Sequence, residues 1–288
     1  MSVLKSKVKI ALIQFACGLP DKTVNFQNCR KFVARAMKTQ PATELVVLPE
    51  CFNSTYSTSE FRKNAEVIEP SSPSVKFLSD LAREHKITLV GGSIPELEPS
   101  SNSVFNTCLI FDKTGQLIGR HRKVHLFDID IPGGITFKES DTFTGGSTTT
   151  TVNTPFGKVG VGICYDMRFP ELATVSARKG AFAMIYPSAF NTTTGPLHWH
   201  LLARARSVDN ELYTILCSPA RSPATDYQAY GHSLVVDPQG NVIAEAGEGE
   251  DIVYAELDPE KIQQMRNNIP VTTQTRFDVY HDVSSDAK

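Results

Sequence analysis

The chain has 288 residues, of which 41% are hydrophobic and 21% charged, and 29 basic against 31 acidic residues give a formal net charge of -2. This near-balance excludes the basic excess of proteins that bind nucleic acid or an anionic membrane surface. No apolar run reaches the ~18 residues that a membrane span needs. We therefore expect a soluble globular protein with neither nucleic-acid nor membrane partners.

The cysteines and the N-terminus bear on the compartment. The first residues, Met-Ser-Val-Leu-Lys-Ser-Lys, run directly into a strand-like segment without the apolar core of a secretory signal. Six cysteines are scattered without CxxC spacing, which predicts neither a zinc site nor a disulfide framework. We expect a cytoplasmic protein, with the mitochondrion as the alternative if a weak targeting signal is present.

The first half of the chain alternates buried-strand and helix patterns. Continuously apolar runs, typical of buried strands, occupy residues 7–16, 43–49 and 87–91. Apolar residues recur at helical spacing in residues 21–39 and 74–85. Residues 104–112 and 116–124 then flank a Lys-Thr-Gly turn and predict an antiparallel hairpin, so we expect a mixed sheet.

The second half begins with residues 126–146, a stretch with glycines and acidic residues but no clear period, which we expect to be an ordered functional loop. A hairpin at Pro155-Phe-Gly157 leads into an apolar strand ending at Cys164, and a helix is expected to follow to about Lys179. Further strands are expected at 181–188, 212–218, 232–236, 242–245 and 252–257, and helices at 196–210 and 261–267. The tail at 282–288 is expected to be disordered.

No linker or shift in composition divides the chain, so we predict a single domain over residues 1–288. The strand–helix units on either side of central hairpins suggest an α/β fold with two sheets packed face to face and helices on the outer faces. A single doubly wound sheet is the alternative, and the pattern alone does not separate the two.

The strongest chemical signal is the stretch Gly160-Val-Gly-Ile-Cys-Tyr-Asp-Met-Arg-Phe-Pro-Glu171, where an apolar strand stops at a cysteine. Glu50 and Lys123, like Cys164, stand at the C-terminal end of a predicted strand, the edge where α/β folds build their sites. A carboxylate can take the thiol proton, the thiolate can attack a carbonyl carbon, and an ammonium can stabilise the oxyanion together with the N–H of Tyr165. Such a site would hydrolyse a C–N bond through a thioester, without a metal or cofactor.

Each of these residues alone also has a structural interpretation. Cys164 could be a small buried hydrophobe, Glu50 could cap the next segment, and Lys123 could belong to a solvated basic cluster. The hypothesis therefore depends on the three occurring together.

These motifs resemble the nitrilase superfamily of carbon–nitrogen hydrolases. Its Glu-Lys-Cys signature matches Leu48-Pro-Glu50, His121-Arg-Lys123-Val-His-Leu-Phe127 and Gly162-Ile-Cys-Tyr-Asp-Met-Arg-Phe-Pro-Glu171, in that order and across nearly the whole chain. Within the superfamily the chain resembles the omega-amidase branch, through the segments 186–199, 206–210 and 230–233. The resemblance implies one carbon–nitrogen hydrolase domain, a four-layer αββα sandwich with two mixed β-sheets packed face to face, and a homodimer.

The resemblance also implies roles for individual residues. Glu50 would be the general base, Lys123 the oxyanion stabiliser and Cys164 the nucleophile, with Glu139 as a second carboxylate near the site. From the residues alone, Glu139 would be an exposed loop charge.

The implied substrate is a small amide, since omega-amidases release ammonia from the terminal amide of 2-oxoglutaramate and 2-oxosuccinamate. These substrates end in a carboxylate, and we predict that Arg168 binds it. Tyr165, Phe190 and Thr194 would bind the substrate beside it.

Several alternatives remain open at this point. Arg168 could instead clamp the turn through Asp166 or Glu171. Deaminated glutathione amidases, N-carbamoyl amino acid hydrolases and true nitrilases would share the catalytic residues and differ in the pocket. A non-catalytic binding protein of the same fold would need none of the three reactive residues.

Overall fold

Two large mixed β-sheets lie face to face at the centre of the computed structural model, which describes residues 3–130, 136–285 and 287–288. The first sheet has the order β15-β1-β2-β3-β5-β4, with β6 also paired to β5. Its strands are β1 (Val8–Gln14), β2 (Leu45–Val47), β3 (Thr88–Val90), β4 (Ile94–Glu98), β5 (Ser103–Phe111), β6 (Leu117–Arg122) and β15 (Asp251–Leu257). The second sheet, in the order β14-β13-β12-β11-β10-β9, has β9 (Thr150–Thr154), β10 (Gly157–Val161), β11 (Ala181–Pro187), β12 (Tyr213–Cys217), β13 (Leu234–Val236) and β14 (Val242–Glu245).

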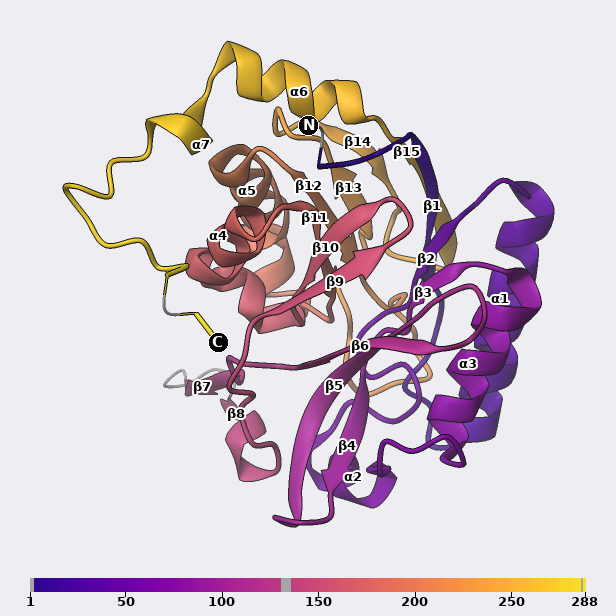
Figure 1. The fold of residues 1–288 in the computed structure, drawn as a ribbon. Helices are drawn as coiled ribbons and strands as arrows, with labels where there is room; N and C mark the ends of the chain where they lie inside the picture. The colour runs from indigo at the N-terminus through magenta and orange to yellow at the C-terminus, as the bar shows by residue number, and fades with distance from the viewer. Residues whose placement is uncertain (1–2, 131–135, 286) are drawn as a thin grey trace.

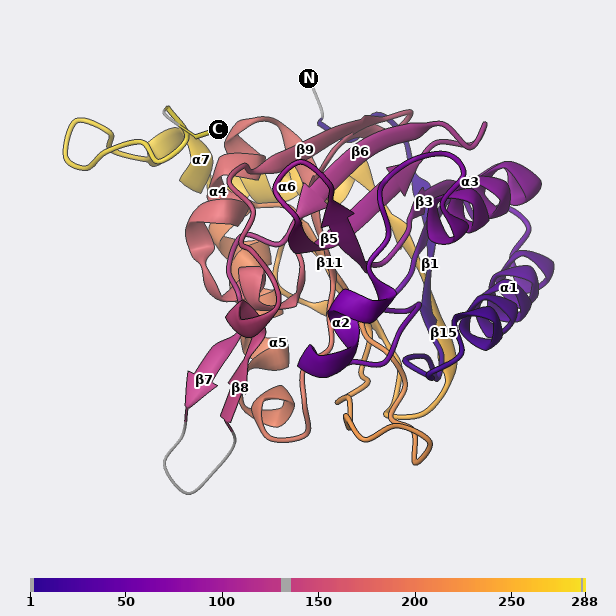
Figure 2. The ribbon, with the colours of Figure 1, turned by 90° about the horizontal axis from the view of Figure 1, so that it is seen from below.

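Helices form the two outer layers (Figures 1 and 2). The first sheet is covered by α1 (Lys22–Thr39) and α3 (Pro73–His85), and the second by α4 (Pro170–Arg178) and α5 (Thr194–Asn210). Three further helices lie outside these layers: α2 (Thr58–Asn64), α6 (Pro259–Asn268) and α7 (Val271–Gln274). The predicted αββα sandwich is confirmed, and the single-sheet alternative is wrong.

Strand β1 shows why a strand that is buried on both faces has no alternation of apolar and polar residues in its sequence. Its residues alternate between two cores: Ile10 and Leu12 pack with the second sheet, whereas Ala11 and Ile13 pack under α1 and α3. All four are fully buried, because helices cover one face and a sheet covers the other. A continuous apolar run is the expected result.

The secondary structure differs from expectation in several places, which include the unpredicted short helices α2 and α7. Residues 126–146 include β7 (Asp128–Asp130) and β8 (Thr136–Lys138), a short exposed hairpin with too few residues to show a period. The helix after Cys164 begins only at Pro170, because proline disfavours helical backbone at the residue before it. Strand β4 gave no signal because it contains Pro95, which suits an edge strand; besides β5, β4 is bridged only by Glu66 within the described residues.

Other observations concern the ends and the cysteines. No helix among the described residues is both long and apolar enough to cross a membrane. All six cysteines are buried and unpaired.

In the C-terminal tail, the Asp282 carboxylate accepts a hydrogen bond of 2.8 Å from Arg178. The single domain over residues 1–288 and the disorder of residues 282–288 stay predictions.

Candidate active site

The structure brings Glu50, Lys123 and Cys164 together at one edge of the two sheets. Glu50 follows β2, Lys123 follows β6 directly, and Cys164 follows β10 as the first residue of a short 3-10 turn, Cys164–Arg168. The Lys123 ammonium donates to Glu50 Oε1 at 3.0 Å and to Glu139 Oε1 at 2.9 Å, and none of the three side chains is exposed. One buried cation therefore joins two carboxylates.

Glu139 is buried, contrary to the expectation from its residue type in a loop. It opens the 3-10 turn Glu139–Asp141, which carries it inward from β8. In addition to the hydrogen bond from Lys123, the Glu139 carboxylate accepts hydrogen bonds from the Tyr56 hydroxyl at 3.1 Å and the Phe127 N–H at 2.8 Å. These donors hold its carboxylate in a fixed position beside Lys123.

The Cys164 thiol lies near the Glu50 carboxylate, and the two groups interact electrostatically. The backbone of Cys164 has a φ of 45°, a left-handed conformation that a non-glycine residue adopts only under constraint. Its thiol also interacts with the N–H of Ala189, at the end of β11. A sharp turn thus presents the sulfur at the end of the strand.

Burial dominates the electrostatics of this group. It raises the pKa of the Glu50 carboxyl above its ordinary value, and Lys123 only partly opposes the rise. Burial and the Glu50 charge hold the pKa of the Cys164 thiol well above its usual range. Burial opposes the charge on Lys123, but Glu139 and Glu50 outweigh it and hold the ammonium pKa well above its ordinary value. The site therefore suits a neutral thiol that passes its proton to Glu50 rather than a stable free thiolate.

A pocket beside the thiol gathers the four residues predicted to bind substrate. Cys164, Tyr165, Arg168, Phe190 and Thr194 all line it; Tyr56, Phe127, Ala189 and Tyr227 complete it. We call it the substrate pocket.

Arg168 lies in this pocket with few competing partners. Its guanidinium carbon lies 5.0 Å from the centroid of the Phe190 ring and 5.6 Å from that of the Tyr165 ring. Its guanidinium forms a polar contact with His198 Nδ1, at 3.1 Å. Within the described part of the chain, no ion pair links Arg168 to Asp166 or Glu171, so the proposed clamp of the turn is absent there.

Sequence reasoning missed three groups that build the site. Asn106 donates to Glu50 Oε1 at 2.9 Å, and Tyr56 contacts Glu139 as described above. Neither follows a motif, because each becomes a neighbour only through strand pairing or loop folding. Asp166, inside the cysteine motif, is the third.

Asp166 ties the Lys123 segment to the cysteine turn. Its buried carboxylate contacts His121 Nε2 at 3.0 Å and His125 Nδ1 at 2.8 Å, and it accepts from the Ile163 N–H at 2.9 Å. Burial opposes its ionisation, yet the hydrogen bonds from the two histidines hold its pKa well below its usual range. The two histidines share this carboxylate from an extended segment, an arrangement that their sequence spacing did not predict.

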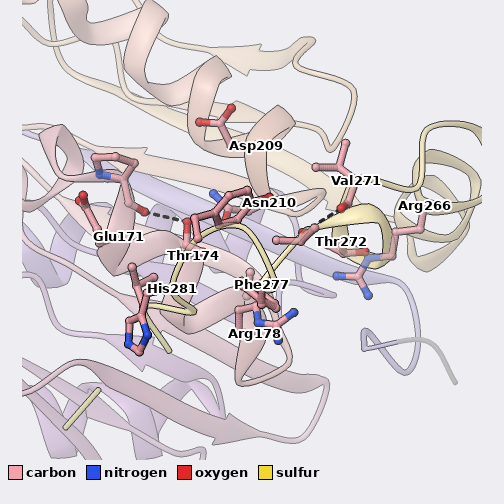
Figure 3. Close-up of a pocket in the computed structure, with 15 residues that line it drawn as sticks. Glu171, Thr174, Arg178, Asp209, Asn210, Arg266, Val271, Thr272, Phe277 and His281 are labelled. Atoms are coloured by element: carbon pink, nitrogen blue, oxygen red, sulfur yellow. Dashed lines mark hydrogen bonds between the residues drawn. The ribbon is translucent and has the colours of Figure 1, made fainter. Parts of the chain in front are cut away.

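Two other features lie away from the thiol. A pocket of about 420 Å³ lies between α4, α5 and the C-terminal segment, lined by Glu171, Arg178 and Phe277 among others (Figure 3), and it contains none of the predicted site residues. His200, His232 and Glu245 place one potential metal-ligand atom each within 4.8 Å of one another. Since both histidines hydrogen-bond to the Glu245 carboxylate, we assign no metal to this group.

Comparisons with known proteins agree with this geometry. A family model described as carbon-nitrogen hydrolase matches residues 9–267. Omega-amidase NIT3 of Saccharomyces cerevisiae is 63% identical over 285 residues, which cover 98% of this chain and 98% of that protein. Omega-amidase NIT2 of Mus musculus is 47% identical over 275 residues, covering 96% and 97%.

Among solved structures, the fold is similar to the crystal structure of Saccharomyces cerevisiae Nit3, a member of branch 10 of the nitrilase superfamily. The TM-score is 0.90 and the sequence identity 60%, and the match covers 96% of this chain and 99% of that one. The predicted superfamily is thereby confirmed.

Proposed function

The chain belongs to the carbon-nitrogen hydrolase family, and on this premise we propose that it is an omega-amidase acting on short dicarboxylic acid monoamides such as 2-oxoglutaramate and 2-oxosuccinamate. It is a hydrolase of non-peptide carbon–nitrogen bonds, and both relatives described above carry the name omega-amidase. The other amidase branches and the binding protein weighed above gain no support from these relatives.

One observation supports the substrate class in particular: a thiol and a guanidinium face the same pocket. Cys164 and Arg168 line it together, with Tyr165 and Phe190 packed beside the guanidinium. An amide bound at the thiol can place a carboxylate at the far end on Arg168, where a charge-assisted hydrogen bond would orient it.

The reaction proposed for this geometry has two stages. Glu50 takes the thiol proton while the sulfur attacks the amide carbon, and the developing oxyanion is stabilised by Lys123 and the N–H of Tyr165. The proton then passes from Glu50 to the leaving nitrogen, so ammonia departs and a thioester remains. Water hydrolyses the thioester, and Glu139 keeps Lys123 in place throughout.

Ammonia release across a panel of substrates tests this proposal. Wild-type enzyme should turn over 2-oxoglutaramate at least about tenfold more efficiently, in kcat/KM, than an N-carbamoyl amino acid, a neutral amide of similar length or an aliphatic nitrile. Arg168→Met should lower kcat/KM for 2-oxoglutaramate by about 10- to 100-fold, because a hydrogen bond between charged groups contributes roughly 1.5–3 kcal/mol.

The neutral amide is the internal control for Arg168. Its turnover should change by less than about threefold in the Arg168→Met variant, because it has no carboxylate to lose. An equal loss on both substrates would contradict the assigned role of Arg168, and a preference for the carbamoyl compound or the nitrile would contradict the omega-amidase assignment itself.

We also propose that the protein is a homodimer that pairs through the outer face of α5. Leu197 and Leu201 are 64% and 63% exposed, and Val208 continues the same stripe two turns later. The opposite face of the helix is buried against the second sheet. The C-terminal segment also exposes Phe277 and Tyr280, which line the 420 Å³ pocket of Figure 3, and we infer that a second copy is the occupant that covers the stripe.

Leu201→Glu should convert the dimer to a monomer, because it places a charge in the centre of the apolar stripe. Size-exclusion chromatography with light scattering would report the mass. Val24→Glu, on α1 at the other side of the molecule, is the matched control and should leave the mass unchanged. A monomeric wild-type protein, or a dimer that survives Leu201→Glu, would contradict this surface.

The proposed location is the cytoplasm, with the mitochondrion as the alternative. The six unpaired cysteines support a reducing compartment.

A further inference from the structure

A second cavity lies next to the substrate pocket, and it is this cavity that reaches Glu50. It has a volume of about 20 Å³, and its lining includes Cys17, Glu50, Cys51, Thr55, Ala220 and Asp226. The substrate pocket contains Cys164 and Arg168 but not Glu50, whereas this cavity contains Glu50 but neither of those two. We call it the Glu50 cavity.

The two sheets build the Glu50 cavity at their common edge. Cys17 follows β1 and Ala220 follows β12, and the Ala220 N–H donates to the Phe15 carbonyl at 3.1 Å, which closes the sheets against each other there. The rings of Tyr56 and Tyr227, with centroids 4.4 Å apart, line both spaces and form a wall between them.

One oxygen of the Glu50 carboxylate accepts no hydrogen bond from the described residues. Oε1 accepts from both Asn106 and Lys123, at 2.9 and 3.0 Å. Oε2 is buried and has no hydrogen-bond partner among the described residues. An unsatisfied buried carboxylate oxygen is costly, which favours a water donor beside it.

The Glu50 cavity has the size and the opening for such a water. About 10–15 Å³ is enough for one water molecule, and the cavity offers about 20 Å³. Its lining passes from buried Glu50 through half-buried Thr55 to exposed Asp226, so it connects the carboxylate with solvent.

We propose that the Glu50 cavity supplies the hydrolytic water that deacylates the enzyme, while the acyl group occupies the substrate pocket. The inference rests on the proposed thioester mechanism. Once ammonia has left, an acyl group on Cys164 with its carboxylate on Arg168 fills the space between these residues, and water from that side would have to pass it.

The deacylation step then needs only the water on one side of Glu50 and the thioester on the other. The water loses a proton to Glu50 Oε2 as its oxygen bonds to the thioester carbon. The carbon–sulfur bond breaks, and the sulfur regains the proton from Glu50. The product acid leaves through the substrate pocket, and the Glu50 carboxylate is regenerated.

Narrowing the Glu50 cavity tests the proposal. Ala220→Leu places additional carbon atoms in it without touching the thiol or Arg168. We expect kcat to fall by about tenfold or more, and the acyl-enzyme, which mass spectrometry of acid-quenched steady-state samples would detect, to become the dominant species. Thr194→Leu, which narrows the substrate pocket instead, should raise KM without accumulating acyl-enzyme.

Three results would overturn the proposal: an unchanged kcat in Ala220→Leu, a fall in kcat with free enzyme dominant, or equal accumulation in Thr194→Leu. Ala229→Val, at a second position of the cavity lining, gives the same readout if Ala220→Leu does not fold. Each comparison uses whichever amide of the panel wild-type enzyme hydrolyses, so a failure of the omega-amidase assignment would show in the wild-type panel and not in these ratios.

Discussion

Replacing Cys164 with alanine should lower ammonia release by at least about 10⁴-fold, because removal of a catalytic nucleophile costs up to about 10⁶-fold in a comparable triad. The thiol is the one nucleophile in the substrate pocket that also contacts Glu50. No other group among the described lining residues can form the thioester. The substitution removes a single buried atom, so the free energy of unfolding should fall by only about 1 kcal/mol.

Three measurements together check this outcome. Steady-state ammonia release gives the activity, thermal unfolding gives the stability, and mass spectrometry of quenched samples shows whether an acyl adduct still forms. Cys29→Ala, at a buried cysteine of α1 far from the site in the sequence, is the control and should keep activity within about threefold. Retained turnover in Cys164→Ala would contradict nucleophilic catalysis by this residue.

Replacing Lys123 with methionine should affect both activity and stability strongly. The ammonium is fully buried, 3.0 Å from Glu50 and 2.9 Å from Glu139. Without it, two buried carboxylates face each other, and breaking a buried ion pair in this way costs roughly 3–5 kcal/mol. Loss of the oxyanion stabiliser should lower kcat by about 10²–10³-fold.

The stability loss in Lys123→Met should depend on pH. Burial already raises the pKa of Glu50, and removing the cation raises it further. A carboxyl whose folded-state pKa is raised contributes stability below its unfolded pKa and loses it as pH rises through the folded pKa. The variant should therefore be less destabilised near pH 5 than near pH 8, as chemical denaturation at the two pH values would show.

A double variant separates the two roles of Lys123. Lys123→Met with Glu139→Gln removes one of the facing charges, so it should recover part of the lost stability at pH 8 and none of the activity. Recovery of activity would show that Lys123 serves only to neutralise Glu139. A single variant with kcat within tenfold of wild type would exclude it as the oxyanion stabiliser.

The layered architecture was predictable because burial leaves a strong mark on the sequence. Strands such as β1, covered by helices on one face and by a sheet on the other, contain an unbroken apolar run, which in β1 is Ile10–Ile13. The positions of these strands were predicted from the apolar runs alone. The division of the strands between two sheets was not, and the resemblance to a known family was needed to choose two sheets over one.

Short elements escaped prediction for the opposite reason. β7 and β8 have three residues each and lie exposed, so no apolar pattern marks them. β4 contains a proline that argues against a strand unless one edge is free. In these segments tertiary pairing, rather than local preference, decides the structure.

By itself the sequence predicted which residues react, because Glu50, Lys123 and Cys164 each stand at the end of a predicted strand, and it led us to expect them at one sheet edge. Only the tertiary structure decided the surroundings of these residues. It buried Glu139 beside its hydrogen-bond donors and placed Asn106 where it donates to one oxygen of Glu50. It also opened a separate cavity on that carboxylate. These relations depend on distances between segments far apart in the chain, which no local pattern of residues records.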